Sequence, residues 1–301
     1  MSKWLREHVK AVLPAPLLNL RFPFGAPLAY RPGHFHSPIC DPADLMQHYR
    51  DPDLTDFKSI DGIDLREQAQ QDLWMSWNRY LRDFPFPDTK GKFRYYCQNR
   101  YFGVGDATVL YCILRHFRPH HVIEIGSGFS SACLLDTIER DLNREIRCAF
   151  IEPHPQLLYS LLKADDARRT VIIPKPVQDV MLATFDQLQA NDILSIDSTH
   201  VLKTGSDVVF ELFNVLPRLR AGVIVHIHDI FYPFEYPRWV INRNYSWNEI
   251  YAVRAFLMNN PKFEILFFID YFTKFARNLV ERDAPRMLPS PSGGLWLRCR
   301  P

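Results

Sequence analysis

The chain is 301 residues long, which is enough for one large domain or two modest ones. Apolar residues make up 47% of it and charged residues 23%, an ordinary composition for a globular protein. Its 36 basic and 34 acidic side chains leave a net charge of +2, which gives no indication of nucleic-acid binding. No apolar stretch approaches the roughly 20 residues of a membrane-spanning helix. The six cysteines lack zinc-type spacing, so we expect free thiols and a cytoplasmic location.

The first hundred residues differ from the rest of the chain. Prolines recur too often over residues 1–60 for long helices, and helical apolar spacing begins only at about residue 64, ending near Leu81. We therefore expect an N-terminal arm and helical cap over residues 1–100 and a ligand-binding domain over 101–301. The arm is a candidate for contacts between copies of the chain in a homo-oligomer.

After residue 106 the sequence alternates between helical and strand-like segments. Asp106 is placed to cap the first helix, at 107–117. Apolar runs predict strands at 121–125, 147–151, 171–173, 193–196, 223–227, 263–269 and 295–299. Helical spacing predicts helices at 129–140, 155–163, 180–188, 206–218 and 249–259.

Such alternation is typical of a parallel sheet with right-handed crossovers. We therefore predict an α/β fold of the Rossmann-like, doubly wound type with a seven-stranded, mostly parallel sheet. A long polar excursion precedes the last strand, which predicts that this strand is antiparallel and lies at the sheet edge.

One stretch, 121–131, has the pattern of a strand, a tight glycine turn and a helix start. Its apolar run ends at Gly126-Ser127-Gly128, and Ser130 follows at the start of the helical segment. Such a turn brings backbone N–H groups close to a ligand. Glu124, inside the strand, disfavours a dinucleotide because a carboxylate repels a pyrophosphate. It favours a cofactor with cationic groups, such as S-adenosylmethionine.

Acidic side chains close three further strands. Glu152 ends the second strand, where a carboxylate accepts hydrogen bonds from the ribose hydroxyls of an adenosine. Asp197 ends the fourth strand and Asp229 the fifth. Two carboxylates at neighbouring strand ends can share a divalent cation with substrate oxygens, so both are candidate ligands of Mg²⁺. The alternative is that they only cap loops and hold the amides of the cofactor.

Several groups near these strand ends are candidates for a general base, namely His200, Lys203, His226 and His228. Imidazole is suited to this role because it titrates near neutrality. His226 and His228 are two residues apart on a strand and so share one face. The alternative is that one of these histidines belongs to the core. The aromatic loop 231–239 is suited to stacking on a sugar or aryl ring, or to packing as a lid.

The motifs at 121–131, 150–153, 192–200 and 222–229 resemble the successive motifs of class I S-adenosylmethionine-dependent methyltransferases. The likeness is to bacterial enzymes that methylate hydroxyls of small molecules or saccharides, and it spans about 95–300. It implies that the methionine part of the cofactor is held by Glu124, Gly126, Ser127, Gly128 and Ser130. It further implies ribose contacts at Glu152 and adenine contacts at Gln178 and Asp179.

The resemblance also implies Mg²⁺ at Asp197 and Asp229. Ile230 stands where related enzymes often have a further ligand, so His200 or His228 would supply a third ligand or act as base. The reaction implied is methyl transfer from S-adenosylmethionine to a hydroxyl, with Asp197, His200 and His228 as the catalytic candidates.

Two alternatives stay open. A nicotinamide-dependent oxidoreductase is disfavoured by Glu124 and by Ser131, which stands where a third glycine would be. A non-catalytic cofactor-binding module is disfavoured by the intact set of acidic strand ends.

Overall fold

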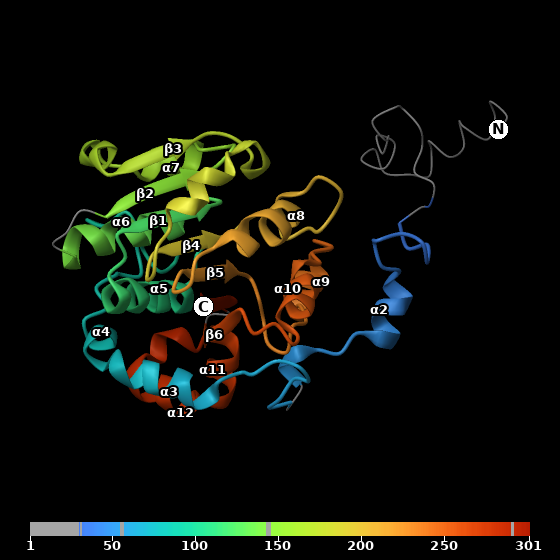
Figure 1. Ribbon diagram of the computed structural model, residues 1–301. Helices are drawn as coiled ribbons and strands as arrows, with labels where there is room; N and C mark the ends of the chain where they lie inside the picture. The colour runs from blue at the N-terminus through green and yellow to red at the C-terminus, as the bar shows by residue number, and fades with distance from the viewer. Residues whose placement is uncertain (1–29, 31, 55–56, 143–145, 290–291) are drawn as a thin grey trace. The chain divides into compact units, whose positions relative to one another are not determined.

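The computed structural model describes residues 30, 32–54, 57–142, 146–289 and 292–301 (Figure 1). The chain divides into two units, Met1–Tyr49 and Arg50–Pro301. In the first unit, helix α2 (Pro42–His48) is capped by Asp41, whose carboxylate accepts a hydrogen bond from the N–H of Ala43 at 2.8 Å. The predictions for residues 1–29 lie outside the described residues.

The second unit is built on one sheet, which has seven strands among the described residues, in the order β3-β2-β1-β4-β5-β7-β6. Neighbouring strands are parallel except at β7, which is antiparallel to both β5 and β6. The predicted α/β fold with an antiparallel last strand is therefore confirmed. The strands are β1 (His121–Ile125), β2 (Arg147–Ile151), β3 (Thr170–Ile173), β4 (Ile193–Ile196), β5 (Ile224–His228), β6 (Phe263–Phe268) and β7 (Gly294–Cys299).

The helices of this unit surround the sheet, and most of them are short. They are α3 (Glu67–Ser76), α4 (Asn78–Arg82), α5 (Val104–Phe117), α6 (Phe129–Asp141), α7 (Gln156–Leu161), α8 (Asp207–Phe210), α9 (Arg238–Asn242), α10 (Glu249–Leu257), α11 (Ile269–Phe275) and α12 (Arg277–Asp283). The 3-10 turns are η2 (Pro52–Leu54), η3 (Ala164–Arg168), η4 (Val177–Asp179), η5 (Leu182–Gln187), η7 (Leu216–Arg218) and η8 (Pro285–Met287), and η6 (Glu211–Val215) is a π-helical turn.

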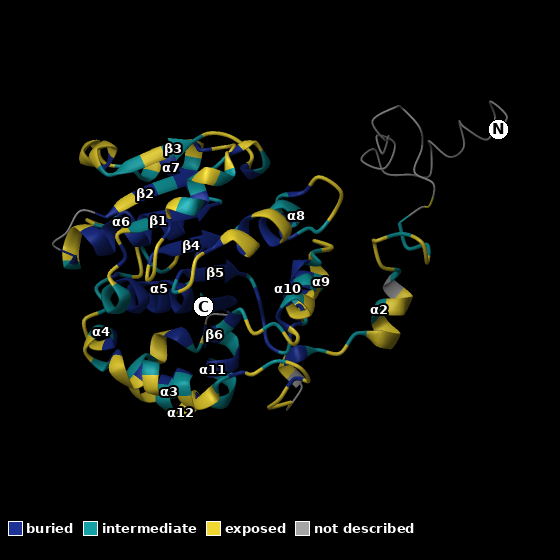
Figure 2. Ribbon diagram, viewed as in Figure 1, coloured by how far each residue is buried: buried dark blue, intermediate teal, exposed yellow. Residues whose placement is uncertain are grey.

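Two hydrophobic clusters cover the two faces of the sheet, because successive strand residues point to opposite faces. Ile123 and Ile125 pack in one cluster, with side chains from η5, α8 and α10. Val122 packs in the other, with side chains from α3, α5, α6 and α12. Figure 2 shows the central strands buried between these layers. Glu124 and His228 alternate with the residues of the first cluster, so they face the α5 layer.

Four local predictions are wrong. The helix expected at 180–188 is the 3-10 turn η5. The last strand is not at the sheet edge, because β7 is inserted between β5 and β6. Asp106 does not cap a helix, since α5 begins at Val104 and Asp106 lies buried inside it. The helix expected at 206–218 is a single α-helical turn that passes into η6 and η7, with Pro217 removing an N–H donor in the last turn.

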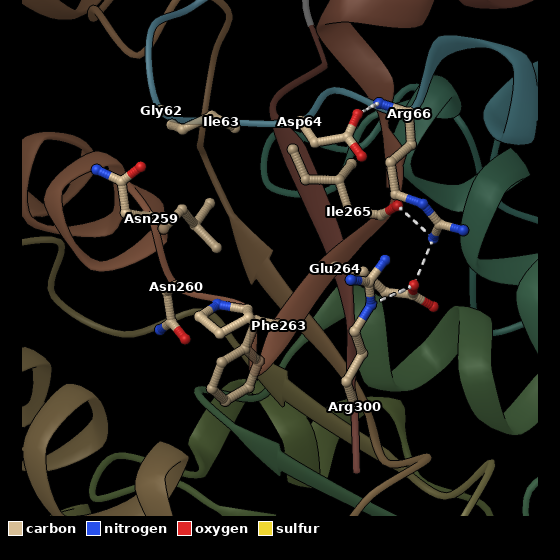
Figure 3. Close-up of a pocket in the computed structure, with 12 residues that line it drawn as sticks. Gly62, Ile63, Asp64, Arg66, Asn259, Asn260, Phe263, Glu264, Ile265 and Arg300 are labelled. Atoms are coloured by element: carbon tan, nitrogen blue, oxygen red, sulfur yellow. Dashed lines mark hydrogen bonds and ion pairs between the residues drawn. The ribbon is translucent and has the colours of Figure 1, made fainter.

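Strand β6 forms the edge of the sheet next to β7. Side chains of the α3 region cover its free backbone groups. Arg66 Nη1 donates to the carbonyl of Ile265 at 3.2 Å, and Oε1 of buried Gln70 accepts from the N–H of Phe268 at 2.8 Å. Figure 3 shows the adjoining cavity, of about 350 Å³, in which Arg66 and Arg300 both pair with Glu264, at 2.9 and 2.8 Å. The polar groups of this cavity therefore satisfy one another and protect the edge from pairing with another strand.

In the part of the chain that the structure describes, we find no helix with the length and apolarity needed to cross a membrane.

Candidate active site

The glycine turn after β1 lies directly against the end of β4. Gly126 has φ +78°, and a Cβ atom at this position would lie 1.7 Å from the carbonyl oxygen of Asp197. The N–H of Gly126 donates to Ile151 at 3.0 Å, and the N–H of Asp197 donates to Ile125 at 2.8 Å. Only glycine fits there, because any side chain would collide with this backbone. The turn and Asp197 therefore form one continuous surface.

Glu124 is buried below this turn. The hydroxyl of Ser131 donates a hydrogen bond to Glu124 and in turn accepts one from the N–H of Gly128 at 3.1 Å. Burial raises the pKa of Glu124 to about 7, which outweighs the opposing hydrogen bonds from Ser131 and Ser130. A buried carboxylate without a cation of its own is suited to an ammonium group of a ligand. Ser130 is also buried, in the first turn of α6.

Glu152 is oriented by the backbone at the end of β2. Its two carboxylate oxygens accept from the N–H groups of Ser127 at 3.1 Å and His154 at 2.7 Å. The hydroxyl of Ser127 is buried without a protein partner in the turn. Three features of this turn fit a cofactor with ammonium and hydroxyl groups. They are the unpaired hydroxyl of Ser127, the carboxylate of Glu124 without a cation, and the backbone at Gly126, where only glycine is tolerated. S-adenosylmethionine meets these requirements, and it would supply an activated methyl group.

The other expected cofactor contacts lie after β3. Asp179 is exposed in η4, and Nε2 of Gln178 donates to the carbonyl of Gly205 at 2.9 Å. Their contact with an adenine stays a prediction.

His200 is buried behind the carboxylates at the ends of β4 and β5. Its Nδ1 lies 2.9 Å from Oε2 of Glu249, while Nε2 lies 3.5 Å from Asp197 and 3.7 Å from Asp229. Burial alone would lower the pKa of His200, but the surrounding carboxylates Asp197, Glu249 and Asp229 raise it well above the ordinary value. These three carboxylates therefore favour the protonated form of His200.

His228 is the histidine that faces open space. Its Nε2 lies 3.7 Å from Oδ1 of Asp229, and its Nδ1 lies 4.0 Å from Oδ1 of Asp106 in α5. Burial works against its protonation, but the charges of Asp197, Asp229 and Asp106 raise its pKa. Burial also raises the pKa of Asp106 to about 7, against the opposing charge of His228. The pair resembles the base and orienting carboxylate of an acid–base site.

The remaining base candidates are placed elsewhere. His226 stacks on Trp296 and lies 3.0 Å from the hydroxyl of Ser195. Burial lowers the pKa of His226 to about 3, so it is a neutral core residue that shares a face with His228 but not its environment. Lys203 is exposed.

The carboxyl group of Asp197 has a lowered pKa. Burial disfavours its charge, but His228 and His200 outweigh this effect and lower its pKa to about 2. Both His200 and Asp229 have left-handed backbones, with φ of +59° and +53°. Non-glycine residues keep this conformation only where the surroundings impose it, and such strain is often found at functional sites.

A cavity of about 760 Å³ opens on this end of the sheet. Asp106, Asp197, His228 and Asp229 line it, together with the aromatic side chains of Tyr101, Phe102, Trp239, Tyr245 and Trp247 and with Arg100 and Arg243. The cavity offers space for a ring-shaped acceptor beside three carboxyl groups and one imidazole. His200 is not among its lining residues.

The Mg²⁺ ligands expected from the sequence, Asp197 and Asp229, stay a prediction. Among the residues that the structure describes, no group of three or more His, Cys, Asp or Glu side chains is arranged to hold a metal ion. Nε2 of His200 faces both aspartates, at 3.5 and 3.7 Å. We therefore assign a metal ion no chemical step.

Sequence analysis missed three buried acids beside this site. Asp106 was predicted to cap a helix, and Glu211 and Glu249 lie in segments that were predicted only as helices, 206–218 and 249–259. Glu211, in η6, accepts from the hydroxyl of Ser198 at 3.0 Å, and burial, with the charges of Glu249 and Asp207, raises its pKa well above the ordinary value. The local sequence carries one signal, an acidic residue among otherwise apolar helix neighbours.

Comparisons with known proteins agree with this geometry. A family model described as a methyltransferase domain matches residues 123–230. An uncharacterized protein from Archaeoglobus fulgidus is 33% identical over an alignment of 178 residues, and the match covers 54% of this chain and 76% of that protein.

Three solved structures illustrate the likeness. A methyltransferase from Podospora anserina with bound SAH has a TM-score of 0.43 at 18% identity, covering 77% of this chain and 88% of that one. The O-methyltransferase TomG from Streptomyces achromogenes with SAM has a TM-score of 0.44 at 14% identity, covering 76% of this chain and 90% of that one. An O-methyltransferase from Bacillus cereus with SAH has a TM-score of 0.41 at 12% identity, covering 78% of this chain and 91% of that one. These values are too low to transfer a substrate or a residue role.

The strand order, the glycine turn and the acidic strand ends define an α/β domain that binds a nucleoside cofactor. Together with the methyltransferase-domain match over residues 123–230, these features identify the chain as a class I S-adenosylmethionine-dependent methyltransferase.

Proposed function

We propose that this methyltransferase transfers the methyl group to a hydroxyl of a small molecule or saccharide bound in the 760 Å³ cavity. The observation that supports this most directly is that Asp197 lies both at the cofactor turn and at the cavity. Its backbone contacts Gly126 of the cofactor turn, and its side chain lines the cavity. The methyl donor and an acceptor would therefore meet at this residue.

The proposed roles follow from what each side chain contacts. Glu124 pairs with the ammonium group of the cofactor, Glu152 accepts from its ribose, and the turn 126–128 with Ser130 encloses its methionine part. His228 accepts the proton of the attacking hydroxyl at Nε2, with Asp106 behind its Nδ1. Because the methyl group arrives activated, the protein mainly aligns the reactants and removes one proton.

His228 is preferred over His200 as base for a geometric reason. His228 lines the cavity, whereas His200 lies behind Asp197 and Asp229 with both ring nitrogens facing carboxylates. Asp197 is ionised over the whole physiological range and so can orient an acceptor hydroxyl by accepting a hydrogen bond from it.

Two measurements test this function. Calorimetric titration should show binding of S-adenosylmethionine, and its absence would remove the proposal. Transfer of labelled methyl groups to a panel of hydroxylated aryl compounds and saccharides should identify acceptors.

His228→Asn should lower kcat by about 10²–10⁴-fold with unchanged cofactor affinity. Full activity of that variant would exclude His228 as base.

Metal assistance is the alternative form of the reaction. It predicts loss of turnover with a chelator and recovery with Mg²⁺, whereas the proposed base predicts neither.

Oligomerisation through the N-terminal arm, a cytoplasmic location, the absence of nucleic-acid binding and a domain boundary at residue 100 stay predictions. Light scattering of the full chain tests the first of them.

A further inference from the structure

Two arginines, Arg100 and Arg243, line the acceptor cavity from segments that are far apart in the chain. Arg100 lies in the loop before α5, and Arg243 directly follows α9. Among the residues that the structure describes, neither guanidinium is within ion-pair distance of a carboxylate, although Asp106, Asp197 and Asp229 line the same cavity. A guanidinium has five N–H donors, so most of the donors of both arginines remain available to a ligand.

The position of Arg100 is set by a closed turn around Asn99. The amide of Asn99 donates to the carbonyl of Phe102 at 2.8 Å and accepts from the N–H groups of Tyr101 and Phe102 at 2.9 and 2.7 Å. The ring of Tyr101 stacks on Phe129 at a centroid distance of 6.0 Å. These contacts hold the backbone on both sides of Arg100, so its side chain extends from a fixed point at the cavity.

Arg243 is positioned by the aromatic wall of the cavity. Its guanidinium carbon lies 5.2 Å from the ring centroid of Trp239 and 5.8 Å from that of Tyr245. Nη1 of Arg243 donates to the hydroxyl of Tyr245 at 3.2 Å. The ring of Tyr245 packs in turn on Trp247, at a centroid distance of 4.6 Å. Three aromatic rings, which can stack on the ring of an acceptor, are therefore next to a guanidinium that has no acidic partner among the described side chains.

The two kinds of charge in this cavity come from different parts of the fold. Asp197 and Asp229 follow the sheet strands β4 and β5, whereas both arginines come from loops. An anionic group on an acceptor is repelled by the carboxylates and attracted by the guanidinium groups. A hydroxyl, in contrast, can donate a hydrogen bond to a carboxylate. The charges would therefore orient an acceptor that has both groups, with its hydroxyl at the aspartates and its anionic group at the arginines.

We propose that the acceptor is a ring compound with an anionic group, a carboxylate or a phosphate, besides the hydroxyl that is methylated, and that Arg100 and Arg243 bind this anionic group. The inference rests on the proposed function, because it names the class of acceptor for the same cavity. The planar guanidinium matches the oxygens of a carboxylate or phosphate, and hydrogen bonds between charged groups are about twice as strong as neutral ones. The two arginines determine specificity and take no part in the transfer of the methyl group.

The test compares matched pairs of probes, titrated calorimetrically at millimolar concentration into the full chain saturated with S-adenosylhomocysteine. The pairs are protocatechuate and its amide, glucuronate and its amide, and a glucose phosphate and glucose. At least one acid should bind about tenfold more tightly than its neutral partner, and its binding should weaken as salt is raised. The pair that shows this preference tells an aryl acid from a sugar acid or a sugar phosphate.

Variants of the two arginines assign the preference to them. Arg100→Gln and Arg243→Gln should each weaken binding of the preferred acid by about three- to tenfold and change that of its neutral partner by less than about twofold. Arg79→Gln is the matched control, since it removes an exposed arginine of α4 that does not line the cavity, and it should change neither. For a probe that is also methylated, KM should rise in the two cavity variants with kcat nearly unchanged.

Three results would overturn the proposal. They are the absence of binding by any of the acids, equal binding of every acid and its neutral partner, and an acid preference that both cavity variants keep. Titration with S-adenosylmethionine separates these results from the proposed function. If the cofactor binds and the acids show no preference, only the class of acceptor is wrong. If the cofactor does not bind, the methyltransferase function fails, and the proposed class of acceptor fails with it.

Discussion

Two buried basic side chains in this protein, Arg94 and His200, are each surrounded by three carboxylates, and they differ in how closely they contact them. Arg94 pairs with Asp136 at 2.5 Å, Asp166 at 2.7 Å and Glu139 at 2.8 Å. His200 lies at 2.9, 3.5 and 3.7 Å from Glu249, Asp197 and Asp229. A guanidinium has five N–H donors and an imidazolium only two.

The two clusters differ in whether carboxylate oxygens remain available to other groups. Arg94 has enough donors for short contacts to all three acids, and its cluster ties the segment before α5 to α6 and η3. His200 can hold Glu249 closely but cannot bond fully to both aspartates, so their oxygens stay available to the cavity. The cluster around Arg94 therefore serves stability, and the cluster around His200 serves the chemistry of the cavity.

The largest expected effect is on the stability of the Arg94 cluster. Arg94→Met leaves Asp166 buried without a cation and Asp136 with only the partly exposed Lys163 at 3.9 Å, which should lower the free energy of unfolding by about 3–5 kcal/mol. Chemical denaturation measures this loss, and the folded fraction should keep its cofactor affinity. A loss below about 1 kcal/mol would contradict the structural role.

The next effect is catalytic and concerns Asp106. Asp106→Asn keeps the shape but removes one of the three carboxylate charges, after those of Asp197 and Asp229, that raise the pKa of His228. We expect kcat to fall about 10–100-fold, and the acid limb of the kcat profile to move to lower pH, because His228 would lose its proton more easily. An unchanged profile would show that Asp106 does not act on His228.

A smaller effect concerns the cofactor turn. Because the pKa of Glu124 is raised to about 7, the carboxylate is protonated below that pH and cannot pair with an ammonium group. Affinity for S-adenosylmethionine should therefore fall as pH drops from 8 to 6. Glu124→Gln should bind about tenfold more weakly with little pH dependence. Calorimetry at three pH values measures both, and a pH-independent wild type would contradict the assignment.

The smallest effect is expected at the exposed side of the Arg94 cluster. Lys163 pairs with Glu139 at 2.8 Å, and both side chains are about half exposed. Lys163→Met should change the free energy of unfolding by less than about 1 kcal/mol, because solvent and salt screen such pairs. A loss as large as that of Arg94→Met would show that the cluster depends on total charge rather than on buried donors.

The sequence by itself determined the alternating α/β order, the antiparallel last strand and the glycine turn at 126–128. These depend on local periodicity and on residues that tolerate unusual backbone, which neighbouring residues reveal. It also placed Glu124, Glu152, Asp197 and Asp229 at the ends of their strands.

Only the tertiary structure decided how those residues are used. Three decisive features join segments that are far apart in the chain. They are the insertion of β7 between β5 and β6, the contact of Asp106 with His228, and the contact of Glu249 with His200. The same applies to the two histidines of β5, which share a face but not a role, since His226 packs on Trp296 of β7 and His228 faces the cavity. Charge and burial at a site depend on such distant partners, and one strand's sequence does not contain them.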